Sequence, residues 1–256
     1  MRSKSVQGPS ASRPHTEVSA LGYPSYGIEP GRNMSDCSVD GDSTPNLPRK
    51  GEFFVISPEA GGPGHGVVIE NADRLRPANQ GLIRPSQGGF PDLPEIPVLR
   101  QTRPGLGPSD LDSSFEGYWL VSRELKAVFE MMDADGFAFV RCDYRLHDDS
   151  AGPELYLCDV VRVLDAIDDQ ASEVEILTEG FPSGKYYEIG MGARLAFRRD
   201  VTGSARVFRS PHNTSLVVCD RKFRDCLVQN GFGVDGCSRG VYLEDAAEYF
   251  MGTIAT

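Results

Sequence analysis

The sequence contains only four histidines in 256 residues, at positions His15, His65, His147 and His212. Histidine is the commonest general base and a frequent metal ligand, so few positions could serve either role. No run of about 18 apolar residues occurs, which leaves no candidate for a membrane-spanning helix. The N-terminus, MRSKSVQGPSASRPH, also lacks the apolar segment of a secretory signal. We therefore expect a cytoplasmic protein that does not bind membranes.

The six cysteines include no C-x-x-C pair, the spacing typical of a tight zinc site. His212, Cys219, Cys226 and Cys237 are spaced too widely to form such a site. A chain of this length in the reducing cytoplasm does not need disulfides for stability. We expect free, mostly buried thiols, and neither a metal nor a cofactor.

Two glycine-rich motifs near the C-terminus lack the context that their usual functions require. Ser238 lies in a G-x-S-x-G sequence, but no histidine follows His212 to complete a hydrolase triad. Gly231, Gly233 and Gly236 have the spacing of a dinucleotide fingerprint, yet a predicted helix precedes them instead of a strand. We therefore identify no catalytic residues and expect no enzymatic activity. A hydrolase-like or deaminase-like enzyme with an unrecognised site is the alternative.

Composition divides the chain into three parts. Residues 1–48 hold 9 Ser, 6 Pro and 5 Gly without an apolar pattern, which predicts a disordered tail. Residues 49–115 contain 9 of the 18 prolines and short apolar runs, typical of a small lobe of short strands and irregular segments. Residues 116–256 show regular elements. The predicted class is α+β, with a mixed sheet and a few helices after the proline-rich lobe and the tail.

Two segments of the third part repeat the same order of strand, helix cap, helix and later strand. In the first, a strand at 118–121 precedes Ser122 as a predicted N-cap. In the second, a strand at 216–219 precedes Asp220 as the cap. Between them we predict a hairpin that pairs 186–189 with 194–198. The apolar spacing of 159–167 fits either a strand or a helix.

Charge is distributed very unevenly along this acidic chain, whose formal net charge is −11. Residues 143–175 carry ten acids and two bases, whereas residues 185–224 carry nine bases and three acids. The two stretches could pair with each other or form separate solvated faces. Alternatively, the acidic stretch could bind a basic partner, since complementary charge steers association. Its candidate partner-binding residues are Asp148, Asp149, Glu154, Asp165, Asp168, Asp169 and Glu173.

The basic stretch offers a different function. Phe197, Phe208 and Phe223 alternate with its arginines, a combination that suits single-stranded nucleic acid. However, the net negative charge disfavours binding to nucleic acid. A nucleic-acid-binding regulator is therefore an alternative, and we expect no nucleic-acid partner.

Scattered apolar, aromatic and Asp/Ser positions resemble immunity protein family 11 of bacterial polymorphic toxin systems. The resemblance runs from about residue 116 to 246, and the stretches at 52–58 and 64–71 look like the N-terminal lobe of one branch of that family. The matching positions include Tyr118-Trp-Leu-Val-Ser, Gly152-Pro, Tyr156, Cys158-Asp159, Asp165, Asp168, Ser172 and Val207-Phe208-Arg209.

The resemblance implies an acidic, non-enzymatic antitoxin that binds and neutralises a cognate secreted antibacterial toxin, such as a nuclease. It carries over no catalytic residues. Asp165, Asp168 and Ser172 could contact the toxin, but Asp and Ser at such spacing also cap helices and close turns. We favour the structural role for these three residues.

Overall fold

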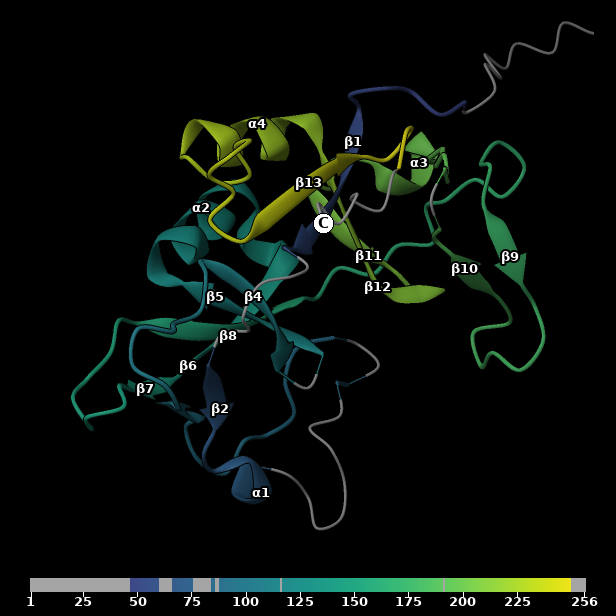
Figure 1. Cartoon of the computed structure of the whole chain (residues 1–256). Helices are drawn as coiled ribbons and strands as arrows, with labels where there is room; N and C mark the ends of the chain where they lie inside the picture. Colours follow the sequence, from purple (N-terminus) through teal and green to yellow (C-terminus); the bar gives the residue numbers. More distant parts are fainter. Residues whose placement is uncertain are drawn as a thin grey trace, which may run out of the picture. The chain divides into compact units, whose positions relative to one another are not determined.

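A computed structural model describes residues 47–59, 66–75, 84–85, 88–115, 117–190 and 192–249 (Figure 1). The chain divides into two units, 1–43 and 44–256, and every described residue belongs to the second. Apart from its last two positions, the tail predicted at 1–48 therefore lies outside the described residues.

The strands are β1 (Phe53–Pro58), β2 (Val67–Ile69), β3 (Val98–Gln101), β4 (Leu111–Phe115), β5 (Tyr118–Ser122), β6 (Phe137–Arg141), β7 (Asp143–Arg145), β8 (Leu155–Val160), β9 (Glu175–Leu177), β10 (Tyr186–Glu188), β11 (Val207–Ser210), β12 (Asn213–Asp220) and β13 (Val241–Asp245). The helices are α1 (Ala72–Leu75), α2 (Arg123–Asp133), α3 (Arg199–Thr202) and α4 (Arg221–Gln229), with a 3-10 turn, η1 (Ala134–Gly136). No helix within this described part of the chain has the length and apolar composition needed to span a bilayer.

The strands form two antiparallel four-stranded sheets and two smaller ones. The large sheets have the strand orders β11-β12-β1-β13 and β4-β5-β8-β6. The third sheet, β2-β3-β7, is mixed because β2 and β3 are antiparallel whereas β3 and β7 are parallel. Strands β9 and β10 pair only with each other among the described residues. The helices, together with antiparallel sheets and one mixed sheet among the described residues, confirm the predicted α+β class.

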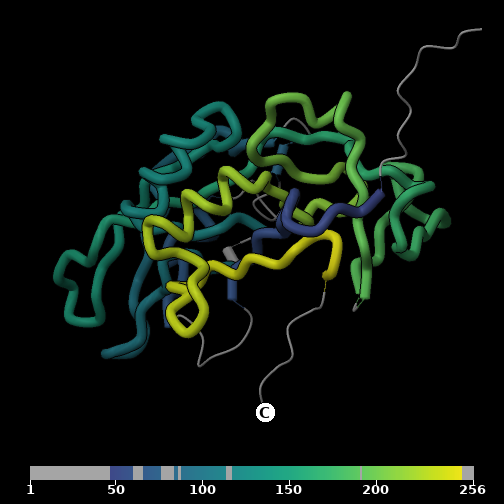
Figure 2. The backbone as a smooth tube through the Cα atoms, turned by 90° about the horizontal axis from the view of Figure 1, so that it is seen from above, coloured from purple at the N-terminus to yellow at the C-terminus, as the bar shows by residue number. Residues whose placement is uncertain are grey.

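Strand β1 lies in the middle of a sheet whose other members come from the C-terminal half of the chain. Val55 pairs with Val218 of β12 on one side and with Glu244 of β13 on the other. In Figure 2, β1 in purple runs beside β13 in yellow. Strand β4 likewise pairs with β5. The proline-rich stretch 49–115 thus contributes strands to sheets that residues 116–256 complete.

Both predicted strand–cap–helix segments are confirmed. The Ser122 side chain accepts a hydrogen bond from the backbone N–H of Leu125 at the start of α2. Asp220 accepts one from the N–H of Phe223 at the start of α4. Each bond satisfies a backbone donor that the first helical turn leaves free, which fixes where the helix begins.

The two helices pack against each other over the sheets through aromatic side chains. The ring centroid of Phe129 in α2 lies 4.5 Å from that of Phe137 and 5.7 Å from that of Phe223 in α4. Ile56 of β1 and Val217 of β12 belong to the same buried cluster. Burial of each such side chain contributes roughly 1.5–3 kcal/mol, so this cluster joins the two segments and β1 into one core.

The predicted hairpin between 186–189 and 194–198 is wrong. Residues of β10 pair with β9, and Tyr187 lies opposite Ile176. The segment after Gly192 pairs elsewhere, because Arg194 bridges Glu173. The ambiguity at 159–167 is also settled: the strand β8 runs to Val160, and irregular backbone with isolated bridges follows.

Candidate functional site

The seven acidic candidates form two separate groups in the fold. Asp148, Asp149 and Glu154 lie between β7 and β8, whereas the other four lie between β8 and β9. Figures 1 and 2 show β7 and β9 on opposite sides of the large sheets. The acidic stretch of the sequence therefore does not form one continuous face.

The group near β7 is matched by arginines from neighbouring elements. Asp149 Oδ1 lies 2.5 Å from Arg100 Nη1. Glu154 lies 3.4 Å from Arg123 and 3.0 Å from Arg141. Asp148 accepts hydrogen bonds from the N–H and hydroxyl of Ser150 instead. These hydrogen bonds to Asp148, and Arg100 beside Asp149, lower the pKa of each carboxyl.

The second group contacts bases of the basic stretch. Lys185 Nζ lies 2.5 Å from Asp169 Oδ2, and Arg194 Nη1 lies 2.9 Å from Glu173 Oε1. Asp165 lies 3.4 Å from both Arg198 Nη2 and His212 Nε2. The two charged stretches thus pair with each other in part. These pairs are partly exposed, and such pairs contribute only about 0–1 kcal/mol each.

Tyr187 anchors this second group to the core. It is fully buried, and its hydroxyl donates a hydrogen bond of 2.6 Å to Asp169 Oδ1. Burial raises the pKa of Tyr187, and the Asp169 carboxylate raises it further. Burial opposes ionisation of Asp169, but the hydrogen bonds from Lys185 and Tyr187 outweigh it and lower the pKa of Asp169. The Asp169 carboxylate is therefore held ionised at the protein surface.

Two of the family-pattern residues hold the backbone in place. Asp168 Oδ1 accepts hydrogen bonds from the backbone N–H groups of Gln170 and Ala171. Ser172 Oγ accepts a bond from the N–H of Ala196 at 2.9 Å. These contacts match the structural role favoured from the sequence, because side chains of this kind close turns.

A shallow groove of about 250 Å³ lies beside this group and is lined by three glutamates. Glu175 of β9 and Glu188 of β10 occupy directly opposite positions in the strand pair. Both are exposed, and neither forms an ion pair with another described residue. The third is Glu173, and Val174, Gly190, Gly192 and Ala193 complete the lining among the described residues. We call Glu173, Glu175 and Glu188 the glutamate groove.

Sequence reasoning did not select Glu175 or Glu188, because the predicted hairpin gave β10 a different partner strand. Opposite residues of an antiparallel pair have Cβ atoms about 4.5–5.5 Å apart, so like charges there destabilise the pair. The signal available for finding Glu188 was the alternation of exposed and buried positions in Tyr186–Glu188. It identifies Glu188 as exposed but cannot name the residue across from it.

A buried ion cluster was also missed. Asp159 of β8 is fully buried, and its Oδ1 lies 2.8 Å from Arg209 Nη2 and 2.8 Å from Arg84 Nε. Asp159 Oδ2 accepts a hydrogen bond from the N–H of Gly89. Burial lowers the pKa of Arg209 to about 10, although Asp159 counteracts this. The cluster joins β8 to β11 inside the protein, where a macromolecular partner cannot reach it.

In the part of the chain that the structure describes, the serine of the G-x-S-x-G sequence contacts a carboxylate and no histidine. Ser238 Oγ donates a 2.5 Å hydrogen bond to Glu59 Oε2. The adjacent Arg239 forms two hydrogen bonds with Asp110. A strand, β13, follows the motif in place of the helix that a nucleophile elbow requires. Within the described ranges no three His, Cys, Asp or Glu side chains are grouped to hold a metal ion.

The buried thiols have raised pKa values. Burial raises the pKa of Cys142 to about 12 and raises those of Cys158 and Cys219 well above the ordinary thiol value. All three are free cysteines. Since the thiolate is the reactive form, these residues act as packing groups.

Comparison with known proteins places this arrangement in a family. No curated protein matches the chain. The model of the Immunity protein family (Imm11) matches residues 52–248, well over half of the chain. The match extends from β1 to the residues after β13, so it includes all the described sheets, both acidic groups and the glutamate groove. The chain therefore belongs to the Imm11 immunity protein family.

Proposed function

We propose that this protein neutralises a cognate secreted antibacterial toxin by binding it, without catalysis. The glutamate groove, together with the exposed carboxylates of Asp165 and Asp169, forms the main contact with a basic region of the toxin. Membership of the immunity family supports the antitoxin role. A nuclease toxin fits this charge, because nucleases bind a polyanionic substrate with basic surfaces.

The observation that carries the proposal is the placement of Glu175 directly opposite Glu188. Like charges in this position cost stability within the free protein. A lysine or arginine of a partner would relieve the repulsion on binding. Near β7, Asp149 and Glu154 already contact arginines of this chain, so this group forms at most a second contact.

Complementary charge at an interface mainly accelerates association. Steered encounters proceed up to about 10⁸–10⁹ M⁻¹s⁻¹ at low salt, compared with about 10⁵–10⁶ without steering. The Debye length falls from about 30 Å at 0.01 M salt to about 8 Å at 0.15 M. A contact of this kind should therefore lose much of its rate advantage as salt rises.

The experiment measures association of the purified protein with its cognate toxin domain, at about 20 mM and 300 mM salt. The double variant Glu175→Lys/Glu188→Lys should associate at least about tenfold more slowly at low salt, with a smaller loss at high salt. The matched control is Asp148→Lys/Asp149→Lys, which changes the same number of charges near β7. Circular dichroism checks the fold of both variants.

A second measurement separates binding from stability. Glu188→Gln removes the repulsion with Glu175, so it should raise the free energy of unfolding by about 0.2–1 kcal/mol while it slows toxin association. A purely structural role predicts the gain in stability without slower association. Equal association rates for the wild type and both Glu175/Glu188 variants at low salt would place the toxin interface elsewhere.

A further inference from the structure

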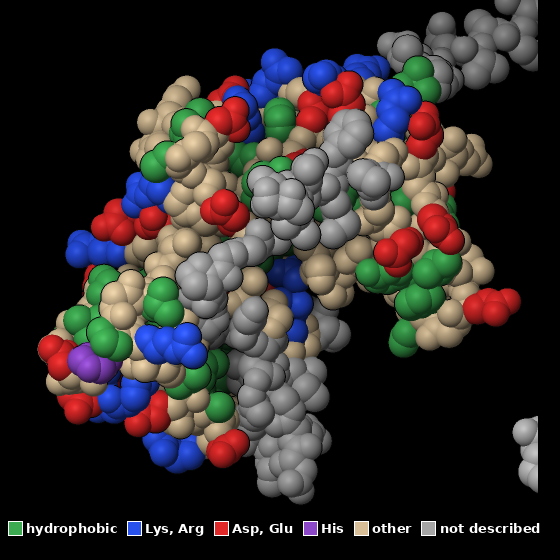
Figure 3. Space-filling model, in the orientation of Figure 1, with side chains coloured by type: hydrophobic (Ala, Val, Ile, Leu, Met, Phe, Trp, Pro, Cys, Tyr) green, Lys and Arg blue, Asp and Glu red, His purple; other side chains and the backbone are tan. Residues whose placement is uncertain are grey.

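A second groove, of about 820 Å³, carries the opposite charge to the glutamate groove. It is enclosed by the chain that enters β1, by the turn between α3 and β11, and by the start of α4. Figure 3 shows Lys and Arg side chains gathered over these elements at the upper margin of the molecule. We call it the basic groove. Its charged residues are Arg49, Lys50, Glu52, Arg199, Arg206, Asp220, Arg221 and Lys222.

Three of the six bases have no carboxylate partner among the described residues. Lys50 pairs with an acid outside the groove, and Arg199 and Arg206 pair with the two acids within it. Arg49, Arg221 and Lys222 form no such pair, and all three are exposed. The Arg221 side chain donates a hydrogen bond to the Gly51 carbonyl. The groove therefore presents unneutralised positive charge on a chain whose net charge is −11.

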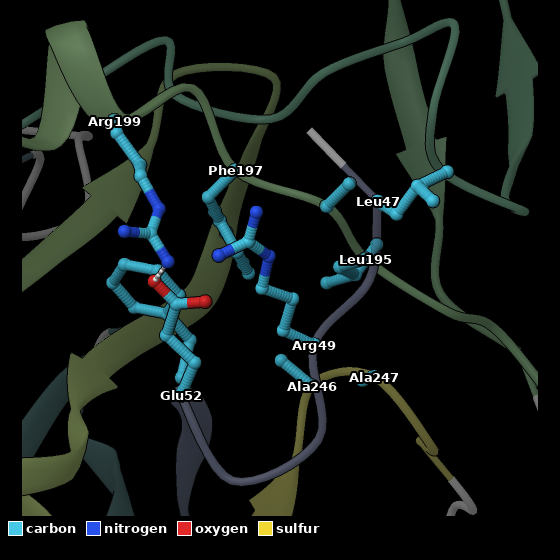
Figure 4. Close-up of a pocket in the computed structure, with 10 residues that line it drawn as sticks. Leu47, Arg49, Glu52, Leu195, Phe197, Arg199, Ala246 and Ala247 are labelled. Atoms are coloured by element: carbon cyan, nitrogen blue, oxygen red, sulfur yellow. Dashed lines mark ion pairs between the residues drawn. The ribbon is translucent and has the colours of Figure 1, made fainter. Parts of the chain in front are cut away.

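Figure 4 shows how two of these arginines lie in the adjoining pocket. Arg199 reaches Glu52, with a distance of 2.7 Å between Nη2 and Oε1. Arg49 extends its guanidinium into the space beside Phe197. Both guanidinium groups therefore lie at the boundary between this pocket and the basic groove, which share Arg49 and Arg199 among their lining residues.

The turn after α3 and the start of α4 also border the groove. Gly203 adopts a φ of 51° in the turn after α3, a conformation that side chains rarely adopt, and it is exposed together with Ser204. The start of α4 points into the same groove through Arg221 and Lys222. Helix N-termini favour negative charge, so the start of α4 adds to the field of the side chains.

We propose that the basic groove binds an acidic peptide segment of the partner protein. An arginine guanidinium presents paired donors that match a carboxylate with two hydrogen bonds. The groove volume of about 820 Å³ is far larger than the volume of one small anion, because a water molecule, which is of similar size, occupies about 30 Å³. The proposal rests on the proposed function, because the partner is the toxin. It adds that the toxin interface contains an acidic segment as well as a basic region.

Nucleic acid fits this groove less well than a peptide. Sites for single strands stack bases on exposed aromatic rings. Among the described residues that line the groove, Phe53 is the only one with an aromatic side chain. Its ring is half-buried and packs 4.6 Å from Phe197 and 6.3 Å from Phe208. It is therefore held by the core and is not available as a stacking platform.

The test uses a fluorescent peptide of ten glutamates as the probe, and fluorescence anisotropy of the full chain at about 20 mM and 150 mM salt. The variant Arg49→Glu/Lys222→Glu should weaken peptide binding at least about tenfold at low salt. The matched control is Arg103→Glu, because Arg103 is also exposed and forms no ion pair with a described residue. This control should bind within about twofold of the wild type.

Each outcome decides the proposal. The proposal is supported if Arg49→Glu/Lys222→Glu loses peptide binding while Arg103→Glu keeps it. Equal binding by this variant and the wild type, or no peptide binding by the wild type, overturns it. A ten-nucleotide oligothymidylate that binds more tightly than the peptide, and is lost in the same variant, overturns it in favour of nucleic acid. If the toxin binds normally while the peptide result is negative, the proposed function stands and only this inference fails.

Discussion

The guanidinium of Arg209 and the carboxylate of Asp159 lie 2.8 Å apart with almost no exposed surface, and they join β11 of one large sheet to β8 of the other. Arg209 also contacts backbone carbonyls of Val160 and Thr214. Removal of charged groups from water is costly, so such a pair is stable only while both partners are present.

Loss of the shared carboxylate should therefore be severe. Asp159→Asn should lower the free energy of unfolding by about 3–5 kcal/mol, because it leaves the buried Arg209 guanidinium without its partner. Arg209→Met should cost less, because Arg84 still pairs with Asp159. Urea unfolding followed by circular dichroism measures the loss. The matched control is Asp143→Asn, which removes the exposed pair with Arg145 and should cost at most about 1 kcal/mol. Similar losses in the buried and exposed variants would contradict the expectation.

Stability should depend on pH through Glu244. Burial raises the pKa of Glu244 from its ordinary value of 4.5 to about 7. Between these two pH values the unfolded chain releases the proton while the folded protein keeps it, so this residue makes stability fall as pH rises. Above pH 7 the folded protein bears the full free-energy cost of a buried, ionised Glu244 carboxylate.

The variant Glu244→Gln removes this dependence. Near pH 4.5 it should melt at the same temperature as the wild type. At pH 8 its melting temperature should be higher, by roughly 2–4 °C for each kcal/mol that the loss of the buried carboxylate adds to the free energy of unfolding. Thermal melts at pH 4.5, 6 and 8 compare the two proteins. A difference that stays constant across these pH values would show that the carboxyl is not responsible.

The cap of α4 should contribute measurably to stability. Asp220 accepts the Phe223 N–H at 2.8 Å and also pairs with Arg206 at 2.6 Å. Asp220→Ala should lower the free energy of unfolding by about 1–2 kcal/mol, because it removes the capping oxygen. Asp220→Asn keeps that oxygen and should cost less. If both variants lose the same amount in urea unfolding, the ion pair and not the cap stabilises the helix.

Ser238 should be dispensable for protection against the toxin. Its hydroxyl contacts Glu59 at an exposed position, so Ser238→Ala should change the free energy of unfolding by about 0.5 kcal/mol or less. Survival of cells that express the toxin with this variant measures protection. A folded, toxin-binding Ser238→Ala protein that no longer protects would support the enzymatic alternative over binding alone.

The sequence predicts the parts of the fold that depend on neighbouring residues. Ser122 and Asp220 were identified as caps because a capping side chain bonds a backbone group three residues later. The pairing of Glu175 with Glu188 could not be predicted in this way. Several strands could serve as the partner of β10, and the apolar pattern of a strand identifies its buried side but not its neighbour.

The sequence also could not predict the buried cluster of Asp159 and Arg209 or the two charged grooves, because they depend on contacts between distant segments. Asp159 and Arg209 are 50 positions apart, and their contact depends on how two sheets pack. The charge runs at 143–175 and 185–224 left open whether the two stretches pair with each other, and Asp169 and Lys185 do pair. Which charges stay unpaired depends on the folded backbone, and each groove contains some of these unpaired charges, such as Glu175 and Arg49.

The central place of β1 also has a consequence for synthesis of the protein. Phe54 pairs with Cys219 and with Asp245, so one of the earliest strands to leave the ribosome has its partners near the end of the chain. Contacts between such distant positions slow folding, because a long loop must close before they form. The cell consequently gains a folded antitoxin only after translation has passed β13, and a ribosome that stalls earlier releases a chain whose apolar β1 has two unprotected edges.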